Sequence, residues 1–437
     1  MNELAKKLNN DLLKYNATIY HLLSELGKKL YYPKGILSQS AEASKKATRF
    51  NATIGIATEN DAPMHFEHIQ ETLQGYSPDD VYPYAPPPGK LDLRLEWKRK
   101  LLRDNPSLKE THMGLPITTN ALTHGLSIAA DLFVDKNDVI ILPDKYWGNY
   151  QTIFHIRRGG ELKTFSLFNQ FNRFNVQALR ERLMEQKEVG KAIVLLNFPN
   201  NPTGYTPGEE EVQGIISVLK EAAEVSIHVV VILDDAYFGL FYEDSVKESL
   251  FGRLAGLHPN LLPIKVDGAT KENYVWGLRV GFLTFASESP EILEVLEQKT
   301  KGLIRGTISS SSHLSQTIIL HSLQSTRFEV EKHKKHKVMK QRAIKVKEIV
   351  RNKKYQTFWS FYPFNSGYFM CLKLKDVDAE ELRLHLLSQY GVGTIAINST
   401  DLRIAFSCVE EEDLEELFEL IYKGIKDLLT KEVEKTI

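Results

Sequence analysis

Cysteine is scarce in this chain of 437 residues, and neither sign of charge is in excess. The two cysteines, Cys371 and Cys408, lie on separate strand-like segments, so we expect neither a disulfide framework nor a metal site. The balance of 55 basic and 56 acidic residues leaves a formal charge of -1, which predicts no nucleic-acid partner. No apolar run approaches membrane-spanning length, and residues 1–7 lack the apolar region of a signal peptide. We therefore expect a cytoplasmic protein without membrane contact.

Enough apolar residues are present to build a large core. With 42% hydrophobic residues, the chain has material for two or three domains. Strand patterns alternate with helical patterns from about residue 111 to 286, which predicts an α/β fold with a mainly parallel sheet between helices. A helix capped by Thr206 is predicted next to Pro207. Residues 314–353 read as one long helix, whose Lys- and His-rich run is typical of a solvated face.

Polar side chains follow two apolar runs that read as buried strands. Residues 191–196 lead into an Asn-Pro-Thr-Gly turn that begins at Asn201, and residues 228–233 lead into Asp234 and Tyr237. Each feature alone is compatible with an ordinary turn or a helix cap. Because ligands bind outside the carboxyl ends of parallel strands, these side chains are expected to face one crevice.

Lys271 and Arg279 lie between two further strand-like runs. A lysine attacks an aldehyde only as the neutral amine, which burial or a nearby positive charge favours. Arg279 would supply such a charge and could hold a phosphate through two hydrogen bonds. Viewed alone, the pair is an ordinary exposed lysine and a surface arginine. Together with the residues at the strand ends, it predicts a site for an aldehyde that carries a phosphate.

A second phosphate anchor and an aromatic wall are predicted upstream. Ala121 and Leu122 lie in a loop that opens a helix, where backbone N–H groups bind anions, although an ordinary capped helix fits the pattern equally well. Trp147 follows the strand-like run 138–143. Its indole could stack on a flat ring, and the alternative is a tryptophan of the core.

These motifs resemble the class I/II aminotransferases of fold type I, which use pyridoxal 5'-phosphate (PLP), and are closest to the aspartate/aromatic branch. The resemblance runs from about Asn51 to the C-terminal helix. It implies a Schiff base on Lys271 and an ion pair between Asp234 and the pyridine nitrogen. It also implies hydrogen bonds from Tyr237 and Asn201 to the phenolic oxygen, and phosphate contacts from Ala121, Leu122, Thr270 and Arg279.

The resemblance also implies the domain organisation. A large PLP-binding domain, residues 76–320, would contain a mainly parallel seven-stranded sheet between helices. A smaller α+β domain would comprise residues 321–437, joined by the N-terminal segment 1–75.

The substrate side of the predicted site rests on the same resemblance. Arg403, on the strand-like run 401–407, would bind the α-carboxylate of an amino acid, although an arginine on a solvated strand face is the alternative. Gly55, Trp147 and Asn201 would also contact the substrate. Tyr84 would reach the cofactor phosphate of a neighbouring subunit, which predicts a homodimer.

Arg305 decides the expected substrate class. It matches the arginine that reads the distal carboxylate of aspartate or glutamate, so dicarboxylates are preferred. An arginine at a helix end that binds carbonyls is the alternative, and aromatic or other apolar amino acids are the second substrate class.

Two positions depart from the family pattern. Gly268 stands where a serine often precedes the lysine, which leaves Thr270 as the nearest hydroxyl, and Tyr150 stands where aspartate aminotransferases place a histidine behind the aspartate. The sequence therefore predicts an aminotransferase with altered cofactor tuning, working in two half-reactions with a 2-oxo acid acceptor. A PLP-dependent lyase or decarboxylase, and a non-enzymatic PLP-binding regulator, are the alternatives.

Overall fold

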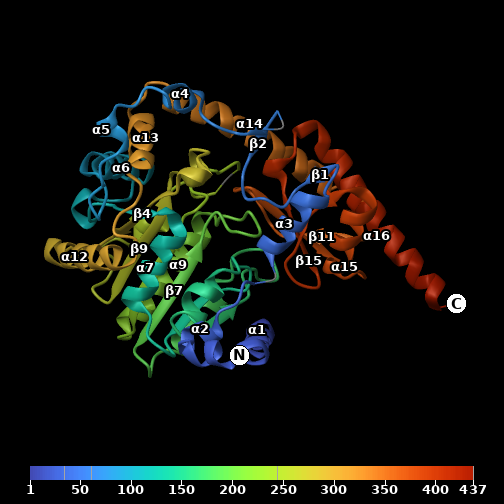
Figure 1. Cartoon of the computed structure of the whole chain (residues 1–437), viewed down its shortest axis with the longest axis horizontal. Coiled ribbons are helices and arrows are strands. Elements are labelled where there is room, and N and C mark those ends of the chain that lie inside the picture. The colour runs from blue at the N-terminus through green and yellow to red at the C-terminus, as the bar shows by residue number, and fades with distance from the viewer. Residues whose placement is uncertain (34, 61, 244, 437) are drawn as a thin grey trace.

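A seven-stranded sheet forms the centre of the larger part of the molecule (Figure 1). The computed structural model describes residues 1–33, 35–60, 62–243 and 245–436. Strand β10 runs opposite to the other six strands of this sheet and is antiparallel to both of its neighbours, β4 and β9. The remaining pairs are parallel, so the sheet is mainly parallel, as predicted. In spatial order the strands are β4 (Ile117–Asn120), β10 (Val280–Phe285), β9 (Leu261–Gly268), β8 (His228–Asp234), β7 (Lys191–Asn197), β5 (Val139–Pro143) and β6 (Glu161–Phe165).

Both faces of this sheet are covered by helices, which explains why its strands are continuous apolar runs. Along β7, Ile193 and Leu195 belong to one buried cluster, whereas Val194 and Leu196 belong to the other. Successive side chains of a strand point to opposite faces, so each strand contributes to both clusters. One cluster includes α7 (Ala121–Phe133) and part of α12 (Pro290–Thr307); the other includes α6 (Leu91–Asp104), α8 (Val176–Met184), α9 (Glu209–Glu224), α10 (Leu250–Leu254) and α13 (His313–Gln324).

A smaller antiparallel sheet lies beside the large part and is built from the C-terminal third of the chain (Figure 1). Its order is β11 (Trp359–Phe361), β12 (Phe369–Leu374), β15 (Asp401–Ala405) and β14 (Ile395–Ala396). The helices of this part are α14 (Phe328–Val350), α15 (Ala379–His385) and α16 (Leu414–Thr436). Short helical turns are η1 (Glu110–His112), η2 (Gln151–Ile156), α11 (Ala269–Glu272), η3 (Trp276–Leu278), η4 (Lys353–Tyr355), η5 (Leu386–Tyr390), η6 (Phe406–Cys408) and η7 (Glu411–Asp413).

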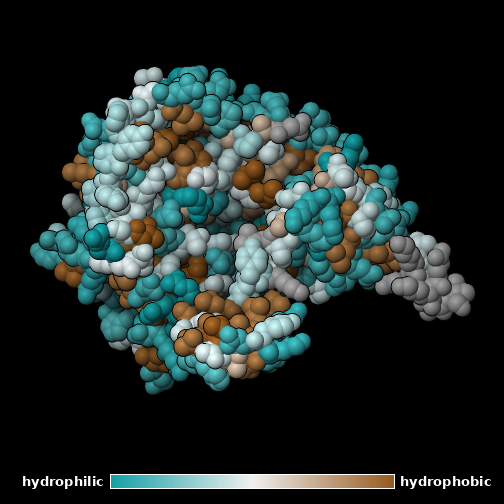
Figure 2. Space-filling model, in the orientation of Figure 1, coloured by the Kyte–Doolittle hydropathy of each residue, from teal (hydrophilic) through white to brown (hydrophobic). Residues whose placement is uncertain are grey.

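The N-terminal region contacts the C-terminal part of the chain. Strand β1 (Phe50–Asn51) pairs with β13 (Val392–Gly393), and α3 (Ile36–Lys46) packs against β13 and β14. The remaining N-terminal elements are α1 (Glu3–Leu22), α2 (Glu25–Lys29), β2 (Thr58–Glu59), β3 (Ala62–Pro63), α4 (Glu67–Thr72) and α5 (Pro78–Val81). In the space-filling view, apolar surface gathers where α1 and α2 lie, and a hollow separates the two parts (Figure 2).

Two local expectations need correction. The helix predicted at Thr206 begins at Glu209, because the Thr206 side chain bonds Ser366 and the Glu211 carboxylate accepts from the N–H of Gly208 instead. The single helix predicted over 314–353 is two helices, α13 and α14, separated at residues 325–327. The domain boundary at residue 320 stays a prediction. Because residue 320 lies inside α13, we propose that the boundary falls at the break between α13 and α14.

The Lys-rich run of α14 is not simply a solvated face. Lys332 and Lys335 have side chains only 20% and 13% exposed, and each forms an ion pair, with Glu272 and Glu59 respectively. The pattern did not reveal this, because the partners lie far away in the sequence. Among the residues that the structure describes, no helix combines the length and apolar character needed to cross a membrane.

Candidate active site

A cavity of about 310 Å³ opens at the carboxyl ends of the central strands and extends to the smaller sheet. Register aligns Asn197, the last residue of β7, with Asp234, the last residue of β8. Strand β9 ends one residue before α11, which carries Lys271. The cavity wall contains eleven of the residues predicted from the sequence: Gly55, Ala121, Leu122, Trp147, Asn201, Asp234, Tyr237, Thr270, Lys271, Arg279 and Arg403.

Two residues of this wall, Lys271 and Asp234, have pKa values that are shifted from their ordinary values. Burial lowers the pKa of Lys271 to about 8; the charge of Asp234 opposes this shift, and that of Arg279 adds to it. Burial also raises the pKa of Asp234 to about 6. Near neutral pH the carboxyl is therefore largely ionised, while a part of the Lys271 population is neutral and nucleophilic. The Lys271 amine lies 5.3 Å from the centre of the Tyr237 ring.

Tyr150 supports Asp234 from behind. Its buried hydroxyl donates a 2.6 Å hydrogen bond to the Asp234 carboxylate, and the Ala236 N–H donates a 3.2 Å bond to the other oxygen. Both hydrogen bonds stabilise the ionised form and oppose the effect of burial. Tyr150, which stands where aspartate aminotransferases place a histidine, is thus a direct hydrogen-bond partner of the Asp234 carboxylate.

Arg403 is held in the wall by three contacts that fix its plane. Its guanidinium donates to the Asn201 side-chain oxygen at 3.1 Å and to the Thr53 carbonyl at 2.7 Å. It also lies 4.1 Å from the centre of the Phe369 ring. The Nε atom of Arg403 is buried without a hydrogen-bond partner. In the part of the chain that the structure describes, no carboxylate is among these contacts, so the buried cation can pair with an anionic ligand.

Asn201 is oriented by its neighbour on β7. The Asn197 side chain donates to the Asp234 carbonyl at 2.7 Å and accepts from the Asn201 N–H at 2.8 Å. Asn197 thereby joins the ends of β7 and β8 to the turn that carries Asn201. The sequence also pointed to this strand end, but Asn197 was not assigned a role.

At the other end of the cavity, the backbone of three segments converges near Arg279. Ala121 has a left-handed φ of 61°, and a Cβ at Gly281 would lie 2.9 Å from the Ala121 Cα atom. A Cβ at Gly268 would lie 2.6 Å from the Val280 carbonyl oxygen. The close approach of β10 therefore leaves no room for the serine that the family often has there.

The exposed groups at this end suit a phosphate. Arg279 is exposed, donates to the Trp276 carbonyl at 3.2 Å, and lines the same cavity as Ala121 and Leu122 at the start of α7. The Thr270 hydroxyl is buried without a partner, which is costly unless a ligand accepts from it. A reactive amine, a carboxylate, an arginine and an orphaned hydroxyl in one cavity are a donor set that fits PLP.

Two predicted residues lie outside this wall. Tyr84 is 95% exposed, and Arg305 is exposed on α12, where its guanidinium donates to the Ser309 hydroxyl. Neither Tyr84 nor Arg305 is among the described residues that line this cavity of one chain. The wall also includes residues that sequence reasoning did not assign to it. Thr53, Ile54, Thr123, Asn197 and Ala236 lie within four residues of predicted ones, whereas Ile36, Ser40 and Phe369 come from other segments.

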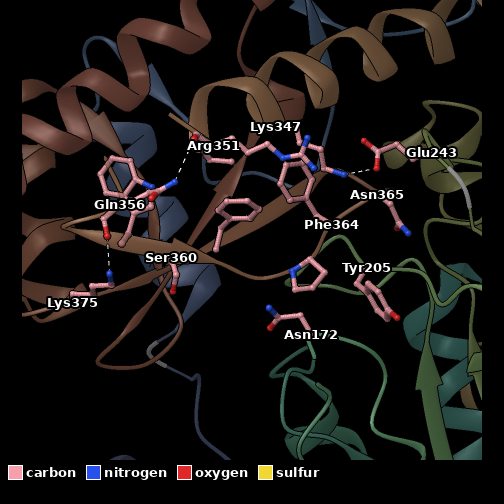
Figure 3. A pocket seen from close by; sticks show the side chains of 14 residues that line it. Asn172, Tyr205, Glu243, Lys347, Arg351, Gln356, Ser360, Phe364, Asn365 and Lys375 are labelled. Carbon is pink, nitrogen blue, oxygen red and sulfur yellow. Dashed lines mark hydrogen bonds and ion pairs between the residues drawn. The ribbon is translucent and has the colours of Figure 1, made fainter. Parts of the chain in front are cut away.

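A second cavity, of about 640 Å³, lies between the smaller sheet and loops of the large part (Figure 3). Lys347 points toward Glu243 and forms an ion pair with it, and Lys375 donates to the Gln356 carbonyl at 2.6 Å. None of the residues predicted from the sequence lines this cavity. Its Lys347 and Glu243 neutralise each other, so it offers no free acid and base pair comparable to Lys271 and Asp234.

One family model and several curated relatives match this chain. The family model described as aminotransferase class I and II matches residues 60–421. The aspartate aminotransferase of Streptomyces avermitilis is 27% identical over 57% of this chain and 60% of its own length, and that of Bacillus subtilis is 23% identical over 60% and 63%. The matches thus span less than two thirds of these curated relatives.

Solved structures extend the likeness over almost the whole fold. An aminotransferase from Anaerococcus prevotii superposes with a TM-score of 0.83 at 24% identity, covering 92% of this chain and 99% of that one. An aspartate aminotransferase from Thermus thermophilus superposes with a TM-score of 0.73 at 17% identity, again over 92% and 99%. At these identities the likeness shows the fold.

Proposed function

Since the chain belongs to the aminotransferase class I and II family, we propose that it is a PLP-dependent aminotransferase that moves the amino group of an L-amino acid to a 2-oxo acid. The observation that carries this proposal is the cavity that holds Lys271, Asp234 and Arg403 together. Bound PLP supplies an electron sink that stabilises negative charge at the substrate's Cα.

The main polar and aromatic residues of the cavity wall have separate proposed tasks. With PLP bound, Lys271 would hold the cofactor covalently and would move the proton at the substrate's Cα as a general base and acid. Asp234, supported by Tyr150, stabilises a positive charge on the ring nitrogen. Tyr237 and Asn201 bind the ring oxygen, and Trp147 stacks on the ring.

The anionic groups have separate partners. Arg279 and Thr270 bind the phosphate together with the backbone at Ala121 and Leu122. Arg403 binds the substrate α-carboxylate, because it is buried and its contacts among the described residues are an amide oxygen, a carbonyl and an aromatic ring. Gly55 allows close approach of the substrate, since the nearest side-chain atoms to a Cβ there would be 3.6 Å away, on Phe369.

The assay for this function separates transamination from the other reactions of PLP. Purified protein loaded with PLP is given single amino acids without an acceptor, and the absorbance of the bound cofactor is followed. Conversion to the pyridoxamine form, reversed by 2-oxoglutarate, is the expected result. Release of ammonia and pyruvate without an acceptor, or release of CO₂, would replace the proposal with a lyase or a decarboxylase.

We propose a homodimer in which Tyr84 and Arg305 complete the site of the partner. Support comes from their exposure and their position outside the cavity of their own chain. With a dicarboxylate donor, a mixture of Lys271→Ala chains with Arg305→Ala or Tyr84→Phe chains should regain part of the activity that each variant lacks by itself, because hybrid dimers contain one intact site. A fully active monomer in solution scattering would contradict this arrangement.

Aspartate or glutamate is the proposed amino donor, because Arg305 would pair with a distal carboxylate. Loss of one partner of a buried ion pair costs about 3–5 kcal/mol, so Arg305→Ala should reduce kcat/KM for dicarboxylates by about 100-fold or more. Apolar amino acids should be unaffected. Equal losses for both classes would show that Arg305 does not read the side chain, and no turnover of either dicarboxylate would favour aromatic or apolar donors.

A further inference from the structure

Glu272 of α11 belongs to a network of paired charges that are buried or half-buried. Glu272, the residue after Lys271, is 5% exposed and accepts from two lysines. Lys100 of α6 lies 2.8 Å from one of its carboxylate oxygens, and Lys332 of α14 contacts the other. Lys100 is 2% exposed and also lies 2.7 Å from Asp104. The proposed reaction uses none of these four groups.

Glu272 is also wedged against the turn that carries Tyr237. A Cβ at Gly239, whose φ is 88°, would lie 2.5 Å from a Glu272 carboxylate oxygen. On the opposite side, the Tyr368 hydroxyl donates a 2.9 Å bond to the Lys271 carbonyl. The backbone on both sides of the reactive amine is therefore held by specific contacts.

Helix α14 connects this clamp to the substrate side of the cavity. Three turns after Lys332, the Arg342 guanidinium donates to the Thr58 carbonyl at 2.8 Å and to the Ser407 carbonyl at 2.7 Å. The Ser407 hydroxyl donates to the Ile56 carbonyl at 2.6 Å, next to the Gly55 segment of the wall. One helix thus contacts both Glu272 and the segments that carry Gly55 and Arg403.

We propose that Glu272 and Lys332 are positioning residues for Lys271, through which the placement of α14 is transmitted to the reactive amine. The ion pair fixes α11 relative to α14, so the Lys271 side chain stays in its desolvated position in the wall. Without Lys332, Lys100 is the one ionic anchor of Glu272 left among the described residues, and Lys271 gains access to water. The link to catalysis rests on the proposed function, whereas the link to the state of the amine does not.

The test measures the amine itself in the cofactor-free protein. Competitive labelling of Lys271 with acetic anhydride at a series of pH values, read by mass spectrometry, gives the midpoint at which the amine becomes neutral. The midpoint of the unaltered protein should lie at about pH 8, because burial lowers the pKa of Lys271. In Lys332→Met it should rise toward the ordinary value of 10.5.

Two variants control this measurement. Lys335→Met removes a lysine one turn along α14 that is similarly shielded from solvent and whose partner, Glu59, is not adjacent to Lys271. In this variant the midpoint of Lys271 should stay at about pH 8. Lys332→Arg preserves the cation and should restore the midpoint. In the PLP-loaded protein, Lys332→Met should reduce kcat by roughly tenfold while KM changes little, as for a residue that acts through another.

Two results would overturn the proposal. One is an unchanged midpoint in Lys332→Met at an unchanged melting temperature; the other is an equal shift in Lys335→Met, which would reveal general loosening of α14. The labelling result does not depend on transamination. Activity that survives Lys271→Ala would therefore refute the proposed function, while a fixed midpoint would refute only the positioning role.

Discussion

Lys271 and Lys100, on the two sides of α11, are both removed from bulk water, yet their pKa values shift in opposite directions. Burial lowers the pKa of Lys271 to about 8, and Asp234 is the carboxylate that opposes the shift. Burial acts on Lys100 in the same sense, but Glu272 and Asp104, at 2.8 and 2.7 Å, hold its pKa above the usual range. The number of close carboxylates therefore decides whether a buried amine is a nucleophile or a structural cation.

The carboxyls around the two lysines differ in the same way. Asp234, with hydrogen bonds from Tyr150 and Ala236, has its pKa raised to about 6 by burial. Burial also acts to raise the pKa of Glu272, but the charges of Lys100 and Lys332 hold it below its usual range. On the cavity side, Thr270 Oγ1 and Arg403 Nε are buried without partners. Charges are thus fully paired behind α11, whereas polar groups in front of it are available to a ligand.

Removal of the amine on the cavity side should have the largest effect. Lys271→Ala should reduce turnover to below about one thousandth, because both covalent attachment and proton transfer are lost. Borohydride reduction followed by mass spectrometry should find no cofactor linked to the chain. Lys299→Ala, at an exposed lysine, should behave like the unaltered protein. A reducible link at full occupancy in Lys271→Ala would refute the assignment.

Neutralising Asp234, the carboxylate on the cavity side of α11, should leave PLP binding intact but should reduce turnover. Asp234→Asn should retain PLP, seen by its absorbance after gel filtration, and should lose about 100- to 1000-fold in kcat because a charge that stabilises the ring nitrogen is gone. Tyr150→Phe, which removes only the hydrogen bond to Asp234, should lose less. Near-native turnover of Asp234→Asn would contradict its proposed role.

Removing Lys100, which pairs with Glu272 and Asp104 behind α11, should lower the free energy of unfolding more than it lowers turnover. Lys100→Met leaves Glu272 and Asp104 with less compensation, and removing one partner of a buried pair costs about 3–5 kcal/mol of unfolding free energy. Lys6→Met removes an exposed helical pair with Glu3 and should cause no measurable change. Denaturant titration of both variants checks the difference. Equal effects would show that burial of the network contributes nothing.

The smallest effect concerns the pH dependence of the free amine. In the cofactor-free protein, the reactivity of Lys271 should rise with pH and level off above about pH 8, because only the neutral amine reacts. The negative charge of Asp234 raises the pKa of Lys271, so Asp234→Asn should move the midpoint below pH 8. An upward movement would show that another group governs this amine.

Much of the fold followed from patterns that depend on local chemistry. The continuous apolar runs at 191–196 and 228–233 predicted β7 and β8, because a strand covered on both faces has no solvated side. Helix boundaries were less well predicted. Thr206 and Pro207 have the composition of a helix start, but the Thr206 hydroxyl is engaged by Ser366 from the smaller part, so α9 begins at Glu209.

The sequence alone determined which chemical groups are available and roughly where the chain presents them. Lys271, Asp234, Tyr237 and Asn201 were predicted to share a site from their positions at strand ends and turns and from the family resemblance, and all four line one cavity. Tertiary structure decided how those groups are paired. The Tyr150 bond to Asp234, the Thr53 contact of Arg403, and the clamp of Glu272 by Lys100 and Lys332 join residues far apart in sequence. Proton affinity depends on desolvation and on charges within a few ångströms, and only the folded chain defines both.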